Sequence, residues 1–208
     1  MRLLALVFGY WVYKPFSLLV RLVLLARGVK VGEGFYIEAV PRLQLNGRSG
    51  NVRLGNNVTI RGDIDLRNRE NGTIVIEDNV SFDTGCRVVA AREAVVTFKE
   101  RADIGLSCIF NCGADLTVGE GVMVGGYAYV QSSNHGTRIG EPIQNQPYSH
   151  APITIGSEAW LGGNVTVLPG ARIGDGAVIG AKALVNSVIP DFAIAVGIPA
   201  AVIGSRGA

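Results

Sequence analysis

The two histidines of this 208-residue chain, His135 and His150, both lie in one polar stretch at residues 131–151. Histidine is the side chain best suited to moving a proton near neutral pH, because its unperturbed pKa is about 6.5. An imidazole held there could take the proton of a hydroxyl while the oxygen attacks an activated carbonyl. A solvated loop histidine without a role is the alternative for each, and His150 matches no motif.

The three cysteines, Cys86, Cys108 and Cys112, show no paired spacing that would predict a disulfide framework. They favour a reducing, cytoplasmic compartment and small buried side chains. Cys108 and Cys112 could supply part of a zinc site together with a histidine, but the sequence contains no second such pair. We therefore expect chemistry without a metal.

A six-residue period in the C-terminal half predicts the scaffold that must position these side chains. Large aliphatic residues recur at Ile155, Leu161, Val167, Ile173, Ile179 and Val185, and a small residue usually follows four positions after each. This period fits neither a helix nor simple strand alternation and is typical of a solenoid. Each hexapeptide would supply one short strand and one corner. Three would complete a turn of about eighteen residues, and the turns would stack as parallel strands.

Similar five-residue stretches, each opened by a large apolar residue, begin at residues 54, 76, 98, 118, 155 and 173, at intervals of 22, 22, 20, 37 and 18. A weaker start at Val31 could open the first turn. The longer early intervals predict extra residues at corners, around 67–72 and 90–94. The interval of 37 predicts one turn plus a long loop at 131–151, and such a loop in a compact repeat is more often functional than accidental.

The first thirty residues differ from this repeat in kind. Two nearly apolar stretches flank Lys14-Pro15, and five basic residues stand there without an acidic one. Because the whole chain has a net charge of +2, the remaining body is weakly acidic. A basic head on an acidic body argues against a nucleic-acid-binding protein and suits contact with an anionic membrane.

We interpret residues 1–30 as a helical segment ahead of a domain at 31–204. Lys14, Ser17 and Arg21 would form one narrow polar stripe on an otherwise apolar helix. Such a helix could lie in a membrane interface, pack on the coil or on a neighbouring subunit, or span the bilayer as a bent helix. A cleaved signal peptide is not expected, because no small-residue cleavage site follows the apolar run.

Several short stretches carry a joint motif: Asn134-His135-Gly136, Pro152–Gly156, Ala159–Val165, Leu168-Pro169-Gly170, Ile179-Gly180-Ala181 and Val196–Ala200. Together they resemble the hexapeptide-repeat O-acetyltransferases, which include the maltose and galactoside acetyltransferases and enzymes that acetylate bacterial exopolysaccharide or lipopolysaccharide sugars. The resemblance covers about Val118–Ile203. It implies an all-β fold, a left-handed parallel β-helix, that assembles as a homotrimer with active sites between subunits. A left-handed coil departs from the usual right-handed crossover rule.

The resemblance also implies acetyl-CoA as the donor, a sugar hydroxyl as the acceptor and His135 as the general base. Asn111 and Asn134 are expected to bind the acceptor, although either could instead shape the turns. The residues expected along the path of acetyl-CoA are Trp160, Gly163, Ala181, Lys182 and Asn186. Trp160 could instead cover the flank of the coil, and Lys182 could pair with a phosphate of CoA or simply be solvated.

The basic apolar head favours a lipid-linked saccharide at the inner face of the cytoplasmic membrane, with peripheral contact through residues 1–27. Such acceptors belong to envelope, capsule or exopolysaccharide biosynthesis. An amino-sugar nitrogen, a small alcohol or an antibiotic is the alternative, with residues 144–150 setting the choice. A β-helical carbonic anhydrase would need three histidines around a metal, and this chain has two. A non-enzymatic membrane-attached scaffold would not need the Asn-His-Gly loop.

Overall fold

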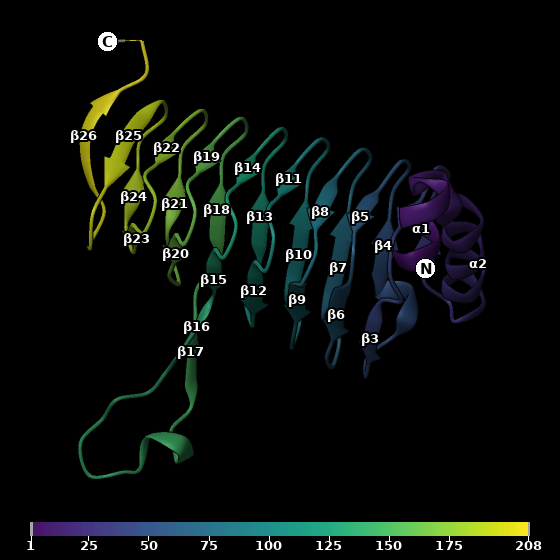
Figure 1. Ribbon diagram of the computed structural model, residues 1–208. Coiled ribbons are helices and arrows are strands. Elements are labelled where there is room, and N and C mark those ends of the chain that lie inside the picture. Colours follow the sequence, from purple (N-terminus) through teal and green to yellow (C-terminus); the bar gives the residue numbers. More distant parts are fainter. Residues whose placement is uncertain (1, 208) are drawn as a thin grey trace.

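The computed structural model describes residues 2–207 and is built mainly on strands of two to five residues joined by short corners. They form three parallel sheets that run the length of one coil, here called sheets A, B and C (Figure 1). Successive strands of the chain fall in sheets A, B and C in turn, so three strands complete one turn. The regular part of the coil therefore has the construction that the six-residue period predicts.

Sheet A contains β1 (Lys30–Val31), β4 (Val52–Leu54), β7 (Thr73–Ile76), β10 (Val95–Phe98), β13 (Leu116–Val118), β18 (Ile153–Ile155), β21 (Arg172–Ile173) and β24 (Val188–Ile189). Sheet B contains β2 (Tyr36–Ile37), β5 (Thr59–Arg61), β8 (Ser81–Asp83), β11 (Asp103–Ile104), β14 (Met123–Val124), β19 (Trp160–Leu161), β22 (Val178–Ile179), β25 (Ala193–Val196) and β26 (Ala201–Ser205). Sheet C contains β3 (Arg42–Leu45), β6 (Ile64–Asn68), β9 (Cys86–Ala90), β12 (Ile109–Cys112), β15 (Tyr129–Gln131), β20 (Thr166–Val167) and β23 (Leu184–Val185).

The interior of the coil is one apolar column. All six aliphatic residues of the C-terminal period are buried, as are the three cysteines, which are free thiols. Phe82, Phe98 and Phe110, which come from sheets B, A and C of two adjacent turns, pack edge to face with ring centroids 5.0 and 4.9 Å apart. The weak start at Val31 is confirmed as the first turn, because β1 pairs in parallel with β4.

The extra residues of the early turns gather at one edge. They lie between a strand of sheet C and the next strand of sheet A, a position here called the C–A corner. The segments at 69–72 and 91–94 lie there, as does the short helix η2 (Ser49–Asn51). The insertion at 131–151 leaves from the same corner. Every insertion into the regular period thus enlarges this one edge of the coil.

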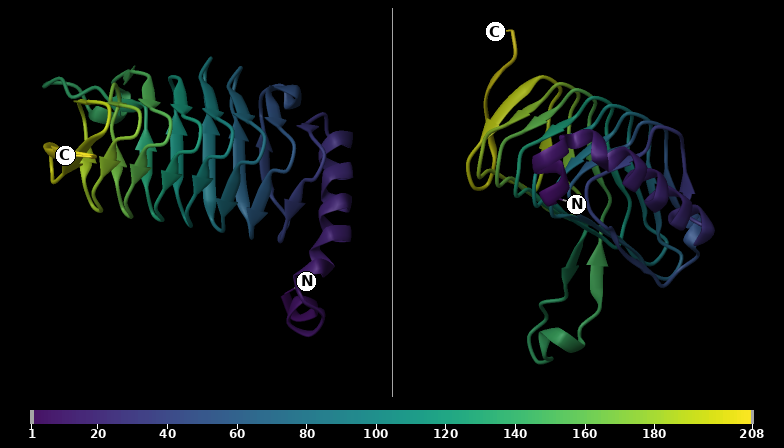
Figure 2. Two further views of the ribbon diagram at one scale, coloured as in Figure 1. Left: turned by 90° about the horizontal axis from the view of Figure 1, so that it is seen from above. Right: turned by 45° about the vertical axis from the view of Figure 1, so that its right-hand side comes forward.

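Helices α1 (Arg2–Phe8), η1 (Tyr10–Val12) and α2 (Tyr13–Ala26) cover the N-terminal end of the coil (Figure 2). Helix α2 buries one face, formed by Tyr13, Ser17, Val20 and Leu24. Residues spaced by three or four positions share a helix face, so this set forms a continuous stripe against the first turn.

Polar side chains of α2 satisfy backbone groups at the open end of the coil. The Ser17 hydroxyl donates to the carbonyl of Ile37 at 3.0 Å and accepts from its N–H at 2.8 Å. The Arg21 guanidinium donates to the carbonyl of Gly32 at 2.7 Å. Unpaired edge strands invite association with other chains, and these contacts cover them. Ser17 and Arg21 of the predicted polar stripe thus face the coil, whereas Lys14 is exposed and much of the apolar surface of α2 faces outward.

Of the three interpretations of the N-terminal segment, packing on the coil is confirmed. No helix within residues 2–207 is long and apolar enough to cross a membrane. At the other end, β26 returns antiparallel to β25 and ends sheet B. The predicted fold class, a left-handed parallel β-helix with an N-terminal helical segment, is confirmed.

Candidate active site

The predicted loop folds as a hairpin that projects from the C–A corner. Strand β16 (Ser133–His135) follows β15 closely and pairs antiparallel with β17 (Tyr148–His150). The short helix η3 (Ile143–Asn145) lies near the tip. Figure 1 shows the hairpin standing away from the coil, so most of its side chains face solvent or a neighbouring molecule rather than the core of their own chain.

His135 shares one face of this hairpin with Ser133, Tyr148 and His150, because alternate residues of paired strands point the same way. The ring centroids of His135 and Tyr148 lie 4.1 Å apart. Those of Tyr148 and His150 lie 6.1 Å apart, with the rings at 23°. His135 is exposed, and its ring makes no hydrogen bond within the described chain. An aromatic contact therefore supports the imidazole while both nitrogens stay open to a substrate.

His150 pairs with Ser133 at the base of the hairpin, where both lie close to Gly113 of the coil. Its Nδ1 lies 2.8 Å from the hydroxyl oxygen of Ser133. A methyl group on Gly113 would lie 2.6 Å from that oxygen and 2.7 Å from His150 Nδ1. Only glycine at position 113 therefore lets the hairpin approach so closely. His150, interpreted from sequence as a plain loop residue, has a defined contact with the coil.

Gln146 organises the outer part of the hairpin. Its side chain is buried, and its Oε1 accepts the backbone N–H of Arg138 at 2.7 Å. Its Nε2 donates to the carbonyls of Arg138 and Glu141, both at 2.8 Å. A buried amide with three hydrogen bonds holds a polar loop in one shape. Sequence reasoning missed Gln146, because its role depends on partners that only the folded loop brings near.

Replacing Gln146 with Ala should loosen the hairpin without unfolding the coil. Each lost hydrogen bond contributes about 1 kcal/mol, so we expect backbone amides at 136–147 to exchange hydrogen at least roughly tenfold faster. Hydrogen exchange read by mass spectrometry measures this directly. Gln144→Ala, an exposed position in the same loop, is the control. Unchanged protection of 136–147 in Gln146→Ala would contradict the assigned role.

Asn134 points to the opposite face of the hairpin from its neighbour His135. Its Oδ1 accepts from Gln131 Nε2 at 3.3 Å, and Gln131 Oε1 accepts from the hydroxyl of Tyr129 at 2.9 Å. This chain of polar contacts ties the start of the hairpin to strand β15. Asn134 is thus engaged within its own chain, whereas His135 is not.

A cavity of about 310 Å³ lies between the hairpin base and the C–A corner of earlier turns. It is lined by Arg69, Glu70, Val89, Ala91, Arg92, Asn111, Cys112, Gly113, Ser133, Tyr148 and His150. Asn111 therefore lies with the face of the hairpin that carries His135, and Asn134 does not. Burial raises the pKa of the Cys112 thiol to about 12, so Cys112 is protonated at neutral pH and unsuited to act as a nucleophile.

The residues expected to meet acetyl-CoA are not all together. Gly163, Ala181 and Lys182 share the corner between sheets B and C in adjacent turns, where the Lys182 N–H donates to the carbonyl of Gly163 at 2.9 Å. Trp160 is exposed on sheet B, and Asn186 follows β23 at the C–A corner. Within one chain, the width of sheet C separates the corner between sheets B and C from the corner that carries the hairpin.

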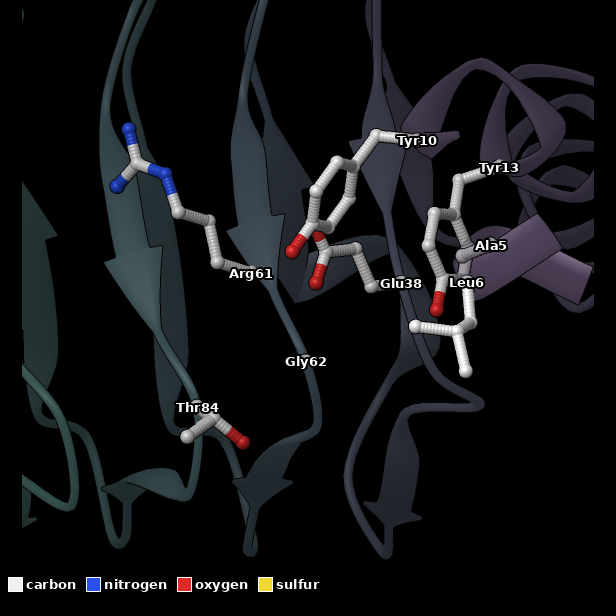
Figure 3. A pocket seen from close by; sticks show the side chains of 8 residues that line it. All are labelled: Ala5, Leu6, Tyr10, Tyr13, Glu38, Arg61, Gly62 and Thr84. Carbon is white, nitrogen blue, oxygen red and sulfur yellow. The ribbon is translucent and has the colours of Figure 1, made fainter. Parts of the chain in front are cut away.

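A second hollow, of about 470 Å³, lies between the N-terminal helices and sheet B (Figure 3). Tyr10, Glu38 and Arg61 line it, and the Tyr36 hydroxyl donates to Glu38 at 3.1 Å. Partial burial and this carboxylate raise the pKa of Tyr36 to about 12. Several turns separate this hollow from the hairpin, so it is not part of the candidate active site (Figure 1).

The arrangement around the hairpin offers proton transfer at a surface rather than chemistry in a closed pocket. An open imidazole stands on a braced hairpin next to a polar cavity. Within residues 2–207, no group of three His, Cys, Asp or Glu side chains is placed to hold a metal ion.

A family description of the bacterial transferase hexapeptide, six repeats long, matches residues 152–187, which are two turns of sheets A, B and C. These C-terminal turns are bacterial transferase hexapeptide repeats. This match lies directly after the hairpin and includes Trp160, Gly163, Ala181, Lys182 and Asn186. The residues that match the hexapeptide repeat are thus the ones that form regular turns of the parallel coil.

Relatives extend the likeness beyond the hexapeptide repeats. Rv3034c of Mycobacterium tuberculosis, whose name assigns it acetyl transfer, is 33% identical over 159 residues, which are 76% of this chain and 51% of that protein. The chain thus spans about half the length of that relative. WbbJ of Escherichia coli, whose name assigns it O-acetyl transfer in lipopolysaccharide biosynthesis, is 28% identical over 143 residues, covering 65% of this chain and 73% of WbbJ.

Among solved structures, the hexapeptide-repeat chain resembles a mutant of AntD, an N-acyltransferase from Bacillus cereus, in complex with dTDP-4-amino-4,6-dideoxyglucose and coenzyme A. The TM-score is 0.61 at 18% identity, with 90% of this chain and 89% of AntD covered. At this level of identity the likeness concerns the fold of the coil and not the reaction.

Proposed function

We propose that this protein transfers an acetyl group from acetyl-CoA to a hydroxyl of a saccharide destined for the cell envelope, a capsule or an exopolysaccharide. One observation carries the proposal. His135 is an open imidazole on a braced hairpin that interrupts an otherwise regular hexapeptide coil. The names of Rv3034c and WbbJ support acetyl transfer, and that of WbbJ supports an oxygen acceptor.

His135 acts as the general base in this proposal. The imidazole takes the proton of the sugar hydroxyl as its oxygen attacks the thioester carbonyl carbon. The tetrahedral intermediate places negative charge on the former carbonyl oxygen, which a backbone N–H of the coil stabilises. When the intermediate collapses, the carbon–sulfur bond breaks and the CoA sulfur takes the proton from the imidazolium. The products are the acetyl ester and free CoA, and His135 is again neutral.

In this proposal the donor, acetyl-CoA, binds along the C-terminal turns of the coil. Gly163 and Ala181 leave room at the corner between sheets B and C for the pantetheine arm, and Lys182 meets a phosphate of CoA. Trp160 walls the channel near the thioester, and Asn186 holds the arm at the last turn. These roles are proposals for the acetyl-CoA path.

We propose a homotrimer in which the hairpin of one subunit completes the donor site of its neighbour. Gly163 and Lys182 lie at one edge of sheet C and His135 projects from the other, so one chain does not bring them together. His135 is also exposed to solvent in the part of the chain that the structure describes. A closed rotational assembly would place a neighbouring coil against each hairpin.

Transfer of labelled acetyl from acetyl-CoA tests the proposed function. We expect labelled ester on a saccharide acceptor, released by mild alkali, together with an equal amount of free CoA thiol. Amino sugars, small alcohols and antibiotics carrying hydroxyls are assayed in parallel. Alkali-stable label on an amino sugar would assign an amide product and overturn the hydroxyl acceptor. Absence of transfer to every class would overturn acyl transfer itself.

The N-terminal helices support a membrane partner. The outward face of α2 exposes Leu18, Leu19, Leu22 and Val23, each by 51–60%. Exposed apolar surface of this extent on one helix marks an interaction site. Lys14 stands on the same helix, also exposed. We propose that this face rests in the interface of an anionic bilayer and brings the enzyme to a lipid-linked acceptor.

Leu18→Ser together with Leu22→Ser should weaken binding to vesicles that contain an anionic lipid by roughly tenfold or more, since two large side chains no longer leave water. Co-sedimentation with anionic and with neutral vesicles measures the change. Val188→Ser removes a comparably exposed side chain from sheet A and serves as the control. Deleting residues 1–27 is a poorer test, because it also strips Ser17 and Arg21 from the first turn. Unchanged sedimentation of the double variant would refute membrane contact through α2.

A further inference from the structure

We propose that the cavity at the hairpin base binds an anionic group of the acceptor, a phosphate or a carboxylate, with Arg69 and Arg92 as its ligands. The inference rests on the proposed function, because it names the class of saccharide that the same site accepts. The cavity, of about 310 Å³, has room for a charged sugar ring or a phosphoryl group.

Arg69 and Arg92 are both exposed at the surface. Both line the cavity, from the C–A corners of two adjacent turns. None of the ion pairs within residues 2–207 includes either guanidinium. A guanidinium presents a planar set of N–H donors that fits the oxygens of a phosphate or carboxylate. Two such groups on neighbouring turns can meet one anion from two sides.

The nearby arginines of sheet C behave differently. Arg67 and Arg87 both bind Asp65, at 2.6 and 3.2 Å. Partial burial by itself would raise the pKa of Asp65, but hydrogen bonds and charge from the two guanidiniums lower it below its ordinary value. This cluster is therefore internally compensated. The cationic field open to a ligand comes from Arg69 and Arg92.

The carboxylate in the cavity is already engaged. Glu70 accepts the backbone N–H of Arg92 at 2.6 Å, which fixes the corner and turns the acid toward the main chain. The Arg92 side chain is thereby left free while its backbone is held. Glu70 still repels an anion, so the proposal requires the two guanidiniums together to outweigh one backbone-bound carboxylate.

The remaining lining connects the cations to His135. Asn111, Ser133 and His150 add hydrogen-bonding groups suited to sugar hydroxyls. Tyr148 lines the cavity and also touches His135, at 4.1 Å between ring centroids. An acceptor held by its anion at Arg69 and Arg92 would therefore extend along one face of the hairpin toward the open imidazole. Its charge would set the orientation in which a hydroxyl reaches the base.

Binding to the His135→Ala protein tests the inference apart from turnover. The probes are glucose 1-phosphate, glucuronic acid and glucose, measured by titration calorimetry. We expect glucose 1-phosphate or glucuronic acid to bind at least roughly tenfold tighter than glucose. The affinity of that charged probe should fall as salt is added. Comparing the affinities of the phosphate and carboxylate probes shows which of the two anionic groups the cavity prefers.

The double variant Arg69→Gln with Arg92→Gln should bind the anionic probe roughly a hundredfold more weakly, because two charge-assisted contacts are lost. Its affinity for glucose should be unchanged. Arg172→Gln, an exposed arginine on sheet A, is the matched control. Equal binding of all three probes, no binding of either anion, or an equal effect of the control variant would overturn the proposal. If the anion binds as expected but the wild-type protein transfers no acetyl group, the cavity assignment stands and the proposed function fails.

Discussion

His135→Ala is expected to lower kcat for acetyl transfer by about 10²–10⁴-fold, the range that a positioned general base contributes. The fold should be unaffected, because His135 is exposed and its one ring contact is with Tyr148. Release of CoA thiol and formation of labelled ester give the rate, and thermal unfolding gives the stability. KM for acetyl-CoA should change little, since the imidazole acts on the acceptor proton.

Ser149→Ala is the control for this result, because Ser149 lies on the same hairpin but on its opposite face. It should keep nearly full activity. Turnover of His135→Ala within a few-fold of the wild type would remove the base from the proposal. A loss of activity accompanied by a lowered unfolding temperature would instead point to a structural role for the ring.

The same variant tests whether sites lie between subunits. His135→Ala and Ala181→Trp, a bulky block at the donor corner, are first shown to be inactive separately. If one site takes His135 from one chain and Ala181 from another, random mixing in equal amounts should restore activity in about a quarter of the sites. If both residues belong to one chain, the mixture stays inactive.

The sequence was sufficient to predict the coil because a hexapeptide repeat is local information. Inward residues such as Ile155 and Leu161 recur at fixed spacing, and stacking identical units has few solutions. Intervals longer than eighteen also showed where residues are added. That all additions share one corner, and so build one functional edge, follows only when every turn is placed in phase with its neighbours.

The polar stripe of the N-terminal helix shows what local pattern does not contain. Ser17 and Arg21 are polar and were expected on one stripe, but periodicity does not say which face meets water. They turn inward because the first turn of the coil has unpaired backbone groups that a hydroxyl and a guanidinium can satisfy. The outward apolar face is then a consequence of that tertiary demand.

The residues of the candidate site also divide into one that the local sequence predicts and others that only the folded structure reveals. His135 was found from a short motif in a loop that breaks the period. Gln146, Arg69 and Arg92 gave no such signal, since surface arginines and loop glutamines are common. The roles of the two arginines depend on contacts between turns, such as the hydrogen bond from the Arg92 N–H to the Glu70 carboxylate, which leaves the Arg92 side chain outside every ion pair found among residues 2–207.

Phe98→Ala is expected to reduce the free energy of unfolding by about 3–5 kcal/mol, through lost burial and the cavity left behind. Phe98 is fully buried and lies between Phe82 and Phe110, so both edge-to-face contacts disappear together. Phe98→Leu keeps most of the volume and should cost clearly less. Urea denaturation followed by circular dichroism measures both, at matched protein concentration because an oligomer would couple the result to it.

The position of Phe98 adds a second expectation. In a solenoid each turn is stabilised chiefly by its two neighbours, so a gap in the middle weakens the coupling between the halves. We expect Phe98→Ala to unfold over a broader range of urea than Phe98→Leu, with hydrogen exchange rising first in the turns before residue 98. These turns carry the longer corners, whereas those after the hairpin are regular and close-packed. A sharp transition with uniform exchange in Phe98→Ala would mean that contacts outside the aromatic stack, including those between subunits, hold the two halves together.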